Sequence, residues 1–102
     1  MLEKDVRKKI VESLKTAYPS SLWYKIHGGP MQEKGIPDII GCYRGVFIGF
    51  EVKRPGKDYS EPTEYQKMQL ANIKRAGGIS GVVTCPQDAF DLMNSRGNPF
   101  KY

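Results

Sequence analysis

Residues 35–53 read GIPDIIGCYRGVFIGFEVK, in which two apolar runs flank the dipeptide Arg44-Gly45. Apolar runs joined by a Gly-containing dipeptide predict a β-hairpin, here with strands over 38–43 and 46–53. Such runs normally belong to a packed interior, where an uncompensated charge is costly. The charged residues near the two ends of this stretch therefore suggest a site rather than a surface.

The expected pairing gathers charged side chains at the open end of the hairpin. A turn centred between Arg44 and Gly45 places Asp38 directly opposite Glu51, and the Cβ atoms of opposed residues lie about 4.5–5.5 Å apart. Lys53 lies two residues beyond Glu51 and points to the same face, whereas Val52 points to the other. A β-bulge would shift this register. In the expected register, two acids and one amine share a face.

Two carboxylates so close need a compensating charge. At about 4 Å they repel by roughly 4 kcal/mol at an effective dielectric near 20. A proton, the Lys53 ammonium or a metal ion can offset this repulsion. The sequence has no His and Cys cluster with zinc spacing, so oxygen ligands indicate a hard cation, Mg²⁺ or Mn²⁺. The alternative is an ordinary acid–lysine salt bridge on an exposed sheet face.

The remainder of the chain is predicted to complete an α/β fold. Apolar periodicity and turn residues predict a helix over 2–18, a strand over 22–27, a helix capped by Ser60 or Thr63 and running to Ala76, a strand over 79–84 and a helix over 86–94. The expected order is α-β-β-β-α-β-α. This order predicts a mixed four-stranded sheet flanked by helices, in a single domain over 1–102.

Two polar side chains fall on the apolar faces of the two long helices. At 100° per residue, Glu3 lies within the apolar stripe that begins with Leu2 and Val6. Glu3 is either an acid favoured in the first turn by the helix dipole or a carboxylate that reaches the sheet and joins the metal site. Gln66 lies at the edge of the other apolar face, as a buried amide, a rim residue or a contact of the site.

The composition predicts a protein of the cytoplasm with a polyanionic partner. The chain has 102 residues, 39% of them apolar, and a net charge of +5, which favours nucleic acid as the partner. Its charged first residues argue against a signal peptide, and no apolar stretch is long enough to cross a bilayer. Cys42 and Cys85 have no CxxC spacing, so we expect free thiols in a reducing compartment.

An ordered set of short motifs resembles the VRR-NUC family (virus-type replication-repair nucleases) of the PD-(D/E)xK nuclease superfamily. Each motif is weak alone, but together they span nearly the whole chain in family order. The matching pieces are Glu3, Lys25 with His27-Gly28-Gly29, Gly35-Ile36-Pro37-Asp38, Glu51-Val52-Lys53, Gln66 and Ala76-Gly77-Gly78.

The resemblance implies a restriction-endonuclease-like core and metal-dependent hydrolysis of phosphodiester bonds. It implies that Asp38, Glu51 and the carbonyl of Val52 bind Mg²⁺ or Mn²⁺, with Glu3 as a further ligand, directly or through water. Lys53 would orient or help deprotonate the attacking water, and Gln66 would support the site. No organic cofactor is implied.

Contacts with DNA are expected from basic residues around the site, although solvated surface charge is the usual role of any one lysine. Arg54 and Lys57 directly follow the strand that carries Glu51, so they are the first candidates for phosphate binding. His27 is interpreted as a loop or phosphate-contacting residue rather than as a base or ligand. The nucleic-acid-binding set is Lys25, His27, Arg54, Lys57 and Lys67.

Small stand-alone members of this family resemble phage-encoded junction-resolving enzymes. A four-way (Holliday) junction has approximate two-fold symmetry, and cutting it needs two active sites, which a C₂ homodimer would supply. The expectation is therefore a homodimeric endonuclease for branched DNA, without a membrane partner, located in the host cytoplasm if phage-encoded. The alternatives are a nicking or restriction-type nuclease on duplex DNA and a non-catalytic DNA-binding module on the same fold.

Overall fold

A mixed four-stranded sheet with helices on both faces forms the part of the chain that the structure, a computed structural model, describes: residues 2–28 and 33–95. The elements are α1 (Glu3–Ala17), β1 (Leu22–Lys25), β2 (Ile39–Tyr43), β3 (Val46–Val52), the 3₁₀ turn η1 (Gly56–Asp58), α2 (Glu64–Arg75), β4 (Ile79–Val83) and α3 (Pro86–Met93). This confirms the predicted order α-β-β-β-α-β-α. The turn η1 falls in a segment where only a loop was expected, and Gly29 of the motif lies outside the described residues.

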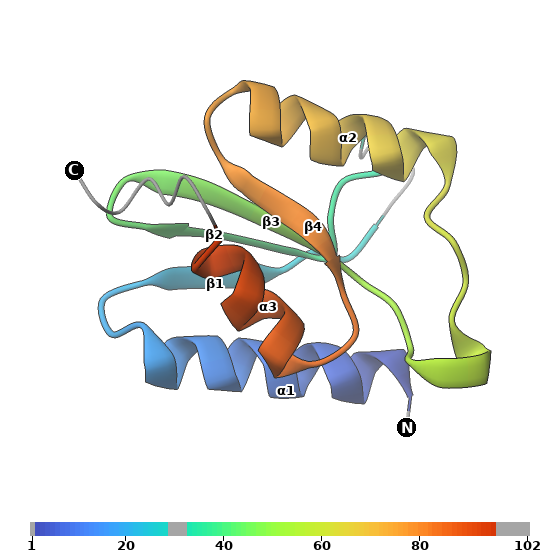
Figure 1. The fold of residues 1–102 in the computed structure, drawn as a ribbon, viewed down its shortest axis with the longest axis horizontal. Helices are drawn as coiled ribbons and strands as arrows, with labels where there is room; N and C mark the ends of the chain where they lie inside the picture. The colour runs from blue at the N-terminus through green and yellow to red at the C-terminus, as the bar shows by residue number, and fades with distance from the viewer. Residues whose placement is uncertain (1, 29–32, 96–102) are drawn as a thin grey trace.

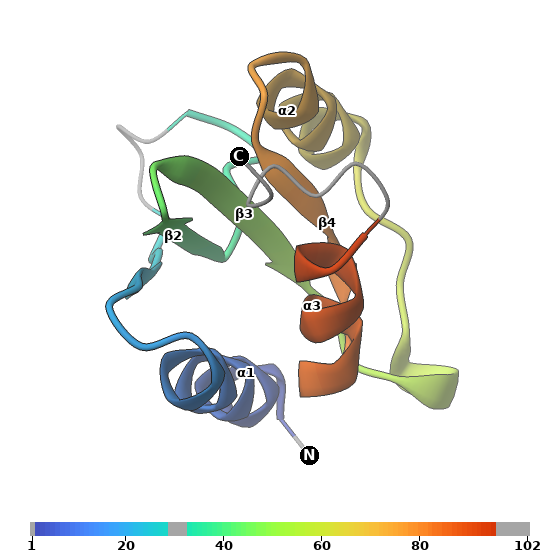
Figure 2. The same cartoon turned by 60° about the vertical axis from the view of Figure 1, so that its left-hand side comes forward.

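The sheet has the strand order β1-β2-β3-β4. The first two pairings are antiparallel, and β3 pairs with β4 in parallel. A parallel pair needs a long crossover, which η1 and α2 provide. Helices α1 and α3 cover one face of the sheet, and α2 covers part of the other (Figures 1 and 2). No helix among the described residues is both long and apolar enough to cross a membrane.

The β2–β3 hairpin has the register that the turn predicted. Its pairs run from Tyr43 with Val46 to Ile39 with Phe50. Arg44 and Gly45 both have positive φ, at 52° and 79°, as a two-residue turn that matches the twist of the strands requires. Asp38 lies just before β2, so continuing this register places it opposite Glu51.

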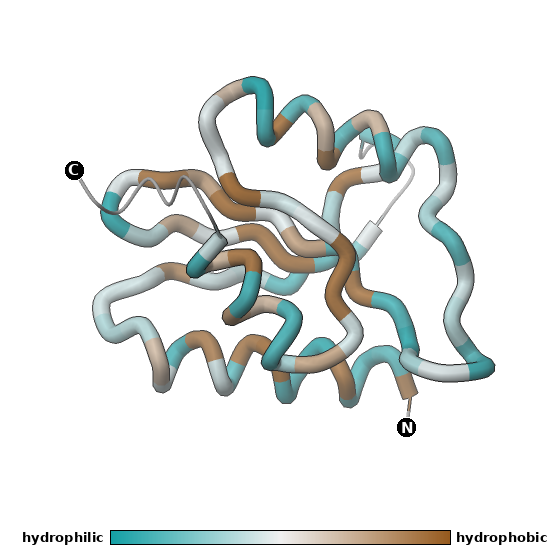
Figure 3. The backbone as a smooth tube through the Cα atoms, in the orientation of Figure 1, coloured by the Kyte–Doolittle hydropathy of each residue, from teal (hydrophilic) through white to brown (hydrophobic). Residues whose placement is uncertain are grey.

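The core lies between the sheet and the helices α1 and α3. Ile48, Phe50 and Val52 alternate along β3 and are fully buried, and the ring of Trp23 stacks on Phe50 with 6.1 Å between the ring centroids. The apolar segments of the strands lie at the centre of the tube in Figure 3. Leu2, which the periodicity placed on the apolar stripe, is 56% exposed because it precedes the first helical residue.

Part of the sheet face that carries α2 is left open. Helix α2 packs on β3 and β4, and on β1, β2 and the start of β3 three large side chains remain exposed: Leu22 (57%), Tyr24 (58%) and Phe47 (48%). Together with Ile40 and Cys42 they surround an apolar groove of about 140 Å³. We call these five residues the β1–β2 apolar face. Both cysteines of the chain are free thiols.

Candidate active site

The carboxylate of Asp38 is held at the end of the β2–β3 ladder by backbone. Its Oδ2 accepts a hydrogen bond of 2.8 Å from the N–H of Val52, and its carbonyl accepts one of 2.7 Å from the N–H of Ile26. Asp38 thus joins β1 and β3 at the point where the regular pairing stops. The backbone bond to Val52 fixes the carboxylate beside the neighbouring residue, Glu51.

Glu51 is a buried carboxylate with only part of its hydrogen-bonding capacity used. It is 2% exposed. Its Oε2 accepts a hydrogen bond of 2.9 Å from Gln66 Nε2 and lies 3.9 Å from Lys53 Nζ. Its Oε1 is buried without a hydrogen-bond partner. An unpaired buried oxygen of this kind is costly, so the arrangement favours a cation or a proton at Oε1.

The protonation of Glu51 reflects this environment. Burial, followed by the negative charge of Asp38, raises the pKa of Glu51 to about 8. The charge of Lys53 opposes the shift, and that of Glu3 adds a smaller increase. In the absence of a cation, Glu51 therefore retains its proton near neutral pH. A divalent cation would replace that proton, because it stabilises both carboxylates.

Gln66 connects the start of α2 to Glu51. Thr63 Oγ1 accepts a hydrogen bond from the N–H of Gln66, and Gln66 Oε1 accepts one of 2.8 Å from the N–H of Thr63. This capping box satisfies helix-terminal donors and leaves Nε2 free to donate to Glu51. This dual role was not predicted, although the Thr-x-x-Gln spacing at 63–66 is a signal for the capping box.

A glycine lets the loop before Asp38 lie against α2. Gly35 has φ of +80°, and a Cβ built there would lie 2.5 Å from the carbonyl carbon of Tyr65. Only glycine fits both the backbone conformation and the space. Beside it, residues 33–36 together with Ile26, Gly28, Asp38 and Gln66 line a cavity of about 270 Å³. Asp38 and Gln66 therefore border this hollow, whereas Glu51 lies behind them and is not among its lining residues.

Glu3 lies beside the acid pair rather than within it. It is exposed in the first turn of α1, yet its charge contributes to the raised pKa of Glu51. Residues 2–28 and 33–95 contain no group of three or more His, Cys, Asp or Glu side chains that could hold a metal ion. The described structure therefore brings together Asp38, Glu51, Lys53 and Gln66, and the role of Glu3 stays a prediction.

The donor set fits a hard cation. The unpartnered Glu51 Oε1 and the nearby carboxylate of Asp38 are oxygen donors, which Mg²⁺ and Mn²⁺ prefer. The pair would share such an ion with water and backbone oxygen, because Mg²⁺ usually keeps several waters and binds one or two carboxylates.

The predicted DNA-binding residues surround this end of the sheet. Arg54 is half-buried directly after Lys53, and Lys57 is exposed on η1. Lys25 and His27 are exposed at and just after the end of β1. Lys67 is exposed on α2, with Nζ 3.5 Å from Glu64 Oε1. Their placement leaves them accessible to a polyanion, and their role in binding it stays a prediction.

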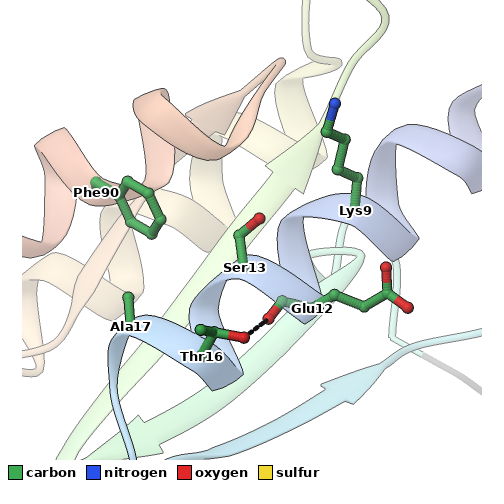
Figure 4. Close-up of a pocket in the computed structure, with 6 residues that line it drawn as sticks. All are labelled: Lys9, Glu12, Ser13, Thr16, Ala17 and Phe90. Atoms are coloured by element: carbon green, nitrogen blue, oxygen red, sulfur yellow. Dashed lines mark hydrogen bonds between the residues drawn. The ribbon is translucent and has the colours of Figure 1, made fainter.

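A wider hollow lies elsewhere, between α1 and α3. It measures about 520 Å³ and is lined by side chains of α1 together with Phe90 (Figure 4). The hydrogen bond within it, from Thr16 Oγ1 to the carbonyl of Glu12, is internal to α1. It borders none of Asp38, Glu51, Lys53 and Gln66, so size alone does not locate the candidate site.

Comparison with known proteins identifies the fold. No protein-family model matches the sequence, and no curated protein matches it. A solved VRR_NUC domain matches with a TM-score of 0.69 and 23% identity, over 89% of this chain and 92% of that chain. Archaeoglobus fulgidus Hjc, a Holliday junction resolvase from an archaeal hyperthermophile, matches with a TM-score of 0.62 and 17% identity, over 80% of this chain and 67% of that chain. The chain thus has the restriction-endonuclease-like fold of the VRR_NUC domain, as its motifs predicted.

Proposed function

We propose that the chain is a Mg²⁺- or Mn²⁺-dependent endonuclease that hydrolyses phosphodiester bonds in branched DNA. The observation that carries the proposal is the buried carboxylate of Glu51, which has one unpartnered oxygen and lies beside Lys53 and the half-buried Asp38. A buried carboxylate with an unused oxygen is costly for a scaffold and useful for holding a cation.

Each residue of the site would have its own role in the hydrolysis. Asp38, Glu51 and the carbonyl of Val52 would hold the cation, and Glu3 would contribute directly or through water. The bound ion would supply polarisation of the phosphoryl oxygen and a lowered pKa for an attacking water. Lys53 would orient or help deprotonate the attacking water and stabilise the negative charge that develops on the phosphate. Gln66 keeps Glu51 in place through the bond from its Nε2.

Branched DNA is the substrate class that the fold and charge favour together. One structural neighbour is named as a Holliday junction resolvase, and the chain carries a net charge of +5. The basic residues around the acid pair would contact the phosphates of the arms. Duplex cleavage, as in a nicking or restriction-type nuclease, and DNA binding without cleavage are the rival outcomes.

A homodimer would give the enzyme the two active sites that a four-way junction needs. In a C₂ dimer the same surface patch of both subunits forms the interface, so the patch must be complementary to a second copy of itself. The β1–β2 apolar face suits this role because its five residues carry no charge and three of them have large exposed side chains. Exposed apolar patches of this kind often mark interfaces.

A cleavage assay tests the proposal. Labelled four-way junction and linear duplex are incubated with Mg²⁺, Mn²⁺ or EDTA, using wild type, Lys53→Ala and, as a matched control, Lys9→Ala. We expect metal-dependent cutting of the junction, loss of cutting in Lys53→Ala with DNA binding retained, and wild-type rates in Lys9→Ala, whose exposed side chain lies on α1 beside the wider hollow. Equal cutting of duplex would remove the branched-DNA claim. Binding of DNA without cutting under every metal condition would refute the proposed nuclease activity.

A further inference from the structure

Arg7 is a basic residue on the inward side of α1, and residues 2–28 and 33–95 supply it with no partner. At 100° per residue it lies about 40° from Glu3 and about 20° from Leu14 around the helix axis, and Leu14 is fully buried. Arg7 itself is half-buried, and its Nε is buried without a hydrogen bond. Within the described residues it takes part in no ion pair.

Helix geometry directs the side chain of Arg7 toward the end of α1 that lies near the acid pair. Helical side chains lean toward the N-terminus of their helix, so a long side chain at position 7 covers the turn that contains Glu3. The charge of Glu3 acts on Glu51, which places the start of α1 near the acid pair. Figure 1 likewise shows the N-terminal end of α1 on the side where β3 ends.

An unpaired, half-buried guanidinium is costly, because burial removes water without supplying an acceptor. An apolar residue at this position would avoid that cost. The arrangement is useful when an anion arrives from outside, since a partly desolvated cation binds it more strongly than a solvated one. A planar guanidinium suits phosphate oxygens, which it contacts with two parallel hydrogen bonds.

We propose that Arg7 binds a backbone phosphate of the DNA strand that enters the acid pair. This inference rests on the proposed function, since it takes the substrate to be DNA. It assigns to α1 a direct contact with the substrate next to the reacting phosphate. Arg7 differs in this from Lys8, which is exposed on the solvent side of the same helix.

The test compares Arg7→Met with Lys8→Met, which removes the same charge one residue away. DNA binding is measured in Ca²⁺, to separate binding from cutting, over a range of salt concentrations. We expect Arg7→Met to weaken binding about tenfold and to reduce the slope of log K against log salt by about one, as loss of one phosphate contact does. Lys8→Met should match wild type in both measurements.

Neutral methylphosphonates placed one at a time along the strand then locate the contact. At the phosphate that Arg7 binds, the modification should cost wild type about tenfold and cost Arg7→Met almost nothing, the coupling expected of a direct contact. If Arg7→Met binds the unmodified DNA as Lys8→Met does, or if no position shows coupling, the proposal is wrong. Should Arg7→Met fail to fold by circular dichroism, Arg7→Lys is measured instead, with a smaller loss at the same phosphate expected.

Failure of this inference is distinguishable from failure of the proposed function. If wild type cuts the junction and Arg7→Met cuts and binds equally well, only the role of Arg7 is lost. If wild type binds DNA without cutting, the coupling to one methylphosphonate still tests Arg7, whereas the nuclease assignment fails. If wild type binds no DNA, both the role of Arg7 and the proposed nuclease function are refuted.

Discussion

Replacing Glu51 by glutamine should stabilise the metal-free protein at alkaline pH. The pKa of Glu51 is about 8 in the folded chain, against an ordinary value of 4.5. Between these values the folded state retains a proton that the unfolded state releases, so stability falls as the pH rises through this window. Each pKa unit corresponds to about 1.4 kcal/mol, so the free energy of unfolding of wild type should fall by about 3 kcal/mol between pH 5 and pH 8.

Glutamine at position 51 has no titratable proton and has nearly the same shape as glutamate. Its amide can accept the bond from Gln66 and donate toward Asp38, in place of the acid proton. Urea denaturation in EDTA at several pH values, with fluorescence of Trp23 as the signal, measures the effect. Glu51→Gln should lose most of the pH dependence, and Glu12→Gln, which changes an exposed acid on α1, should keep the wild-type profile.

The stability gained on adding the cation is a complementary measurement on the same two carboxylates. Mg²⁺ or Mn²⁺ at about 100 times its dissociation constant should add roughly 2.7 kcal/mol to the stability of wild type. Glu51→Gln should gain little, because it loses one of the two carboxylates. A wild-type profile that is flat between pH 5 and pH 8, or one that Glu51→Gln reproduces, would refute the reasoning about the acid pair.

Three further substitutions test the residues that hold the candidate site in place and the β1–β2 apolar face. Gly35→Ala should lower the free energy of unfolding by about 1–3 kcal/mol in urea titrations, because of its positive φ and the close approach to Tyr65. Gln66→Met should lower it by about 1–2 kcal/mol through loss of the capping box, and should slow junction cutting because Glu51 loses its donor. Phe47→Asp should convert a dimer to a monomer in sedimentation measurements, since it places like charges opposite each other; a wild-type monomer would contradict the apolar-face assignment.

The central part of the fold could be predicted because local rules determine it. The turn at Arg44-Gly45 sets the register of the hairpin, and that register places Asp38 beside Glu51. Both follow from the two-residue period of strands and from a turn type that demands positive φ. The mixed sheet followed from the order of apolar segments in the same way.

The features that could not be predicted depend on contacts between elements. The periodicity of α1 gives the direction of Glu3 but not its distance from the sheet, so its exposure required the structure. The second hydrogen bond of Gln66, to Glu51, depends on where α2 packs. Arg7 has the same angular position as the core residues of α1, which periodicity alone does show. That its Nε is buried without a hydrogen-bond partner could be learned only from the structure.

The register of the hairpin ties the chemistry of the site to the stability of the fold. A slip of one residue would turn Glu51 to the face where Phe50 and Val52 now pack against α1 and α3, and would expose those two side chains in its place. Burying the carboxylate there without Gln66 or Lys53 would cost several kcal/mol. The apolar residues of β3 therefore enforce the register that keeps Asp38 and Glu51 together, and the hairpin can tolerate this costly acid pair because the core on its opposite face holds it in place.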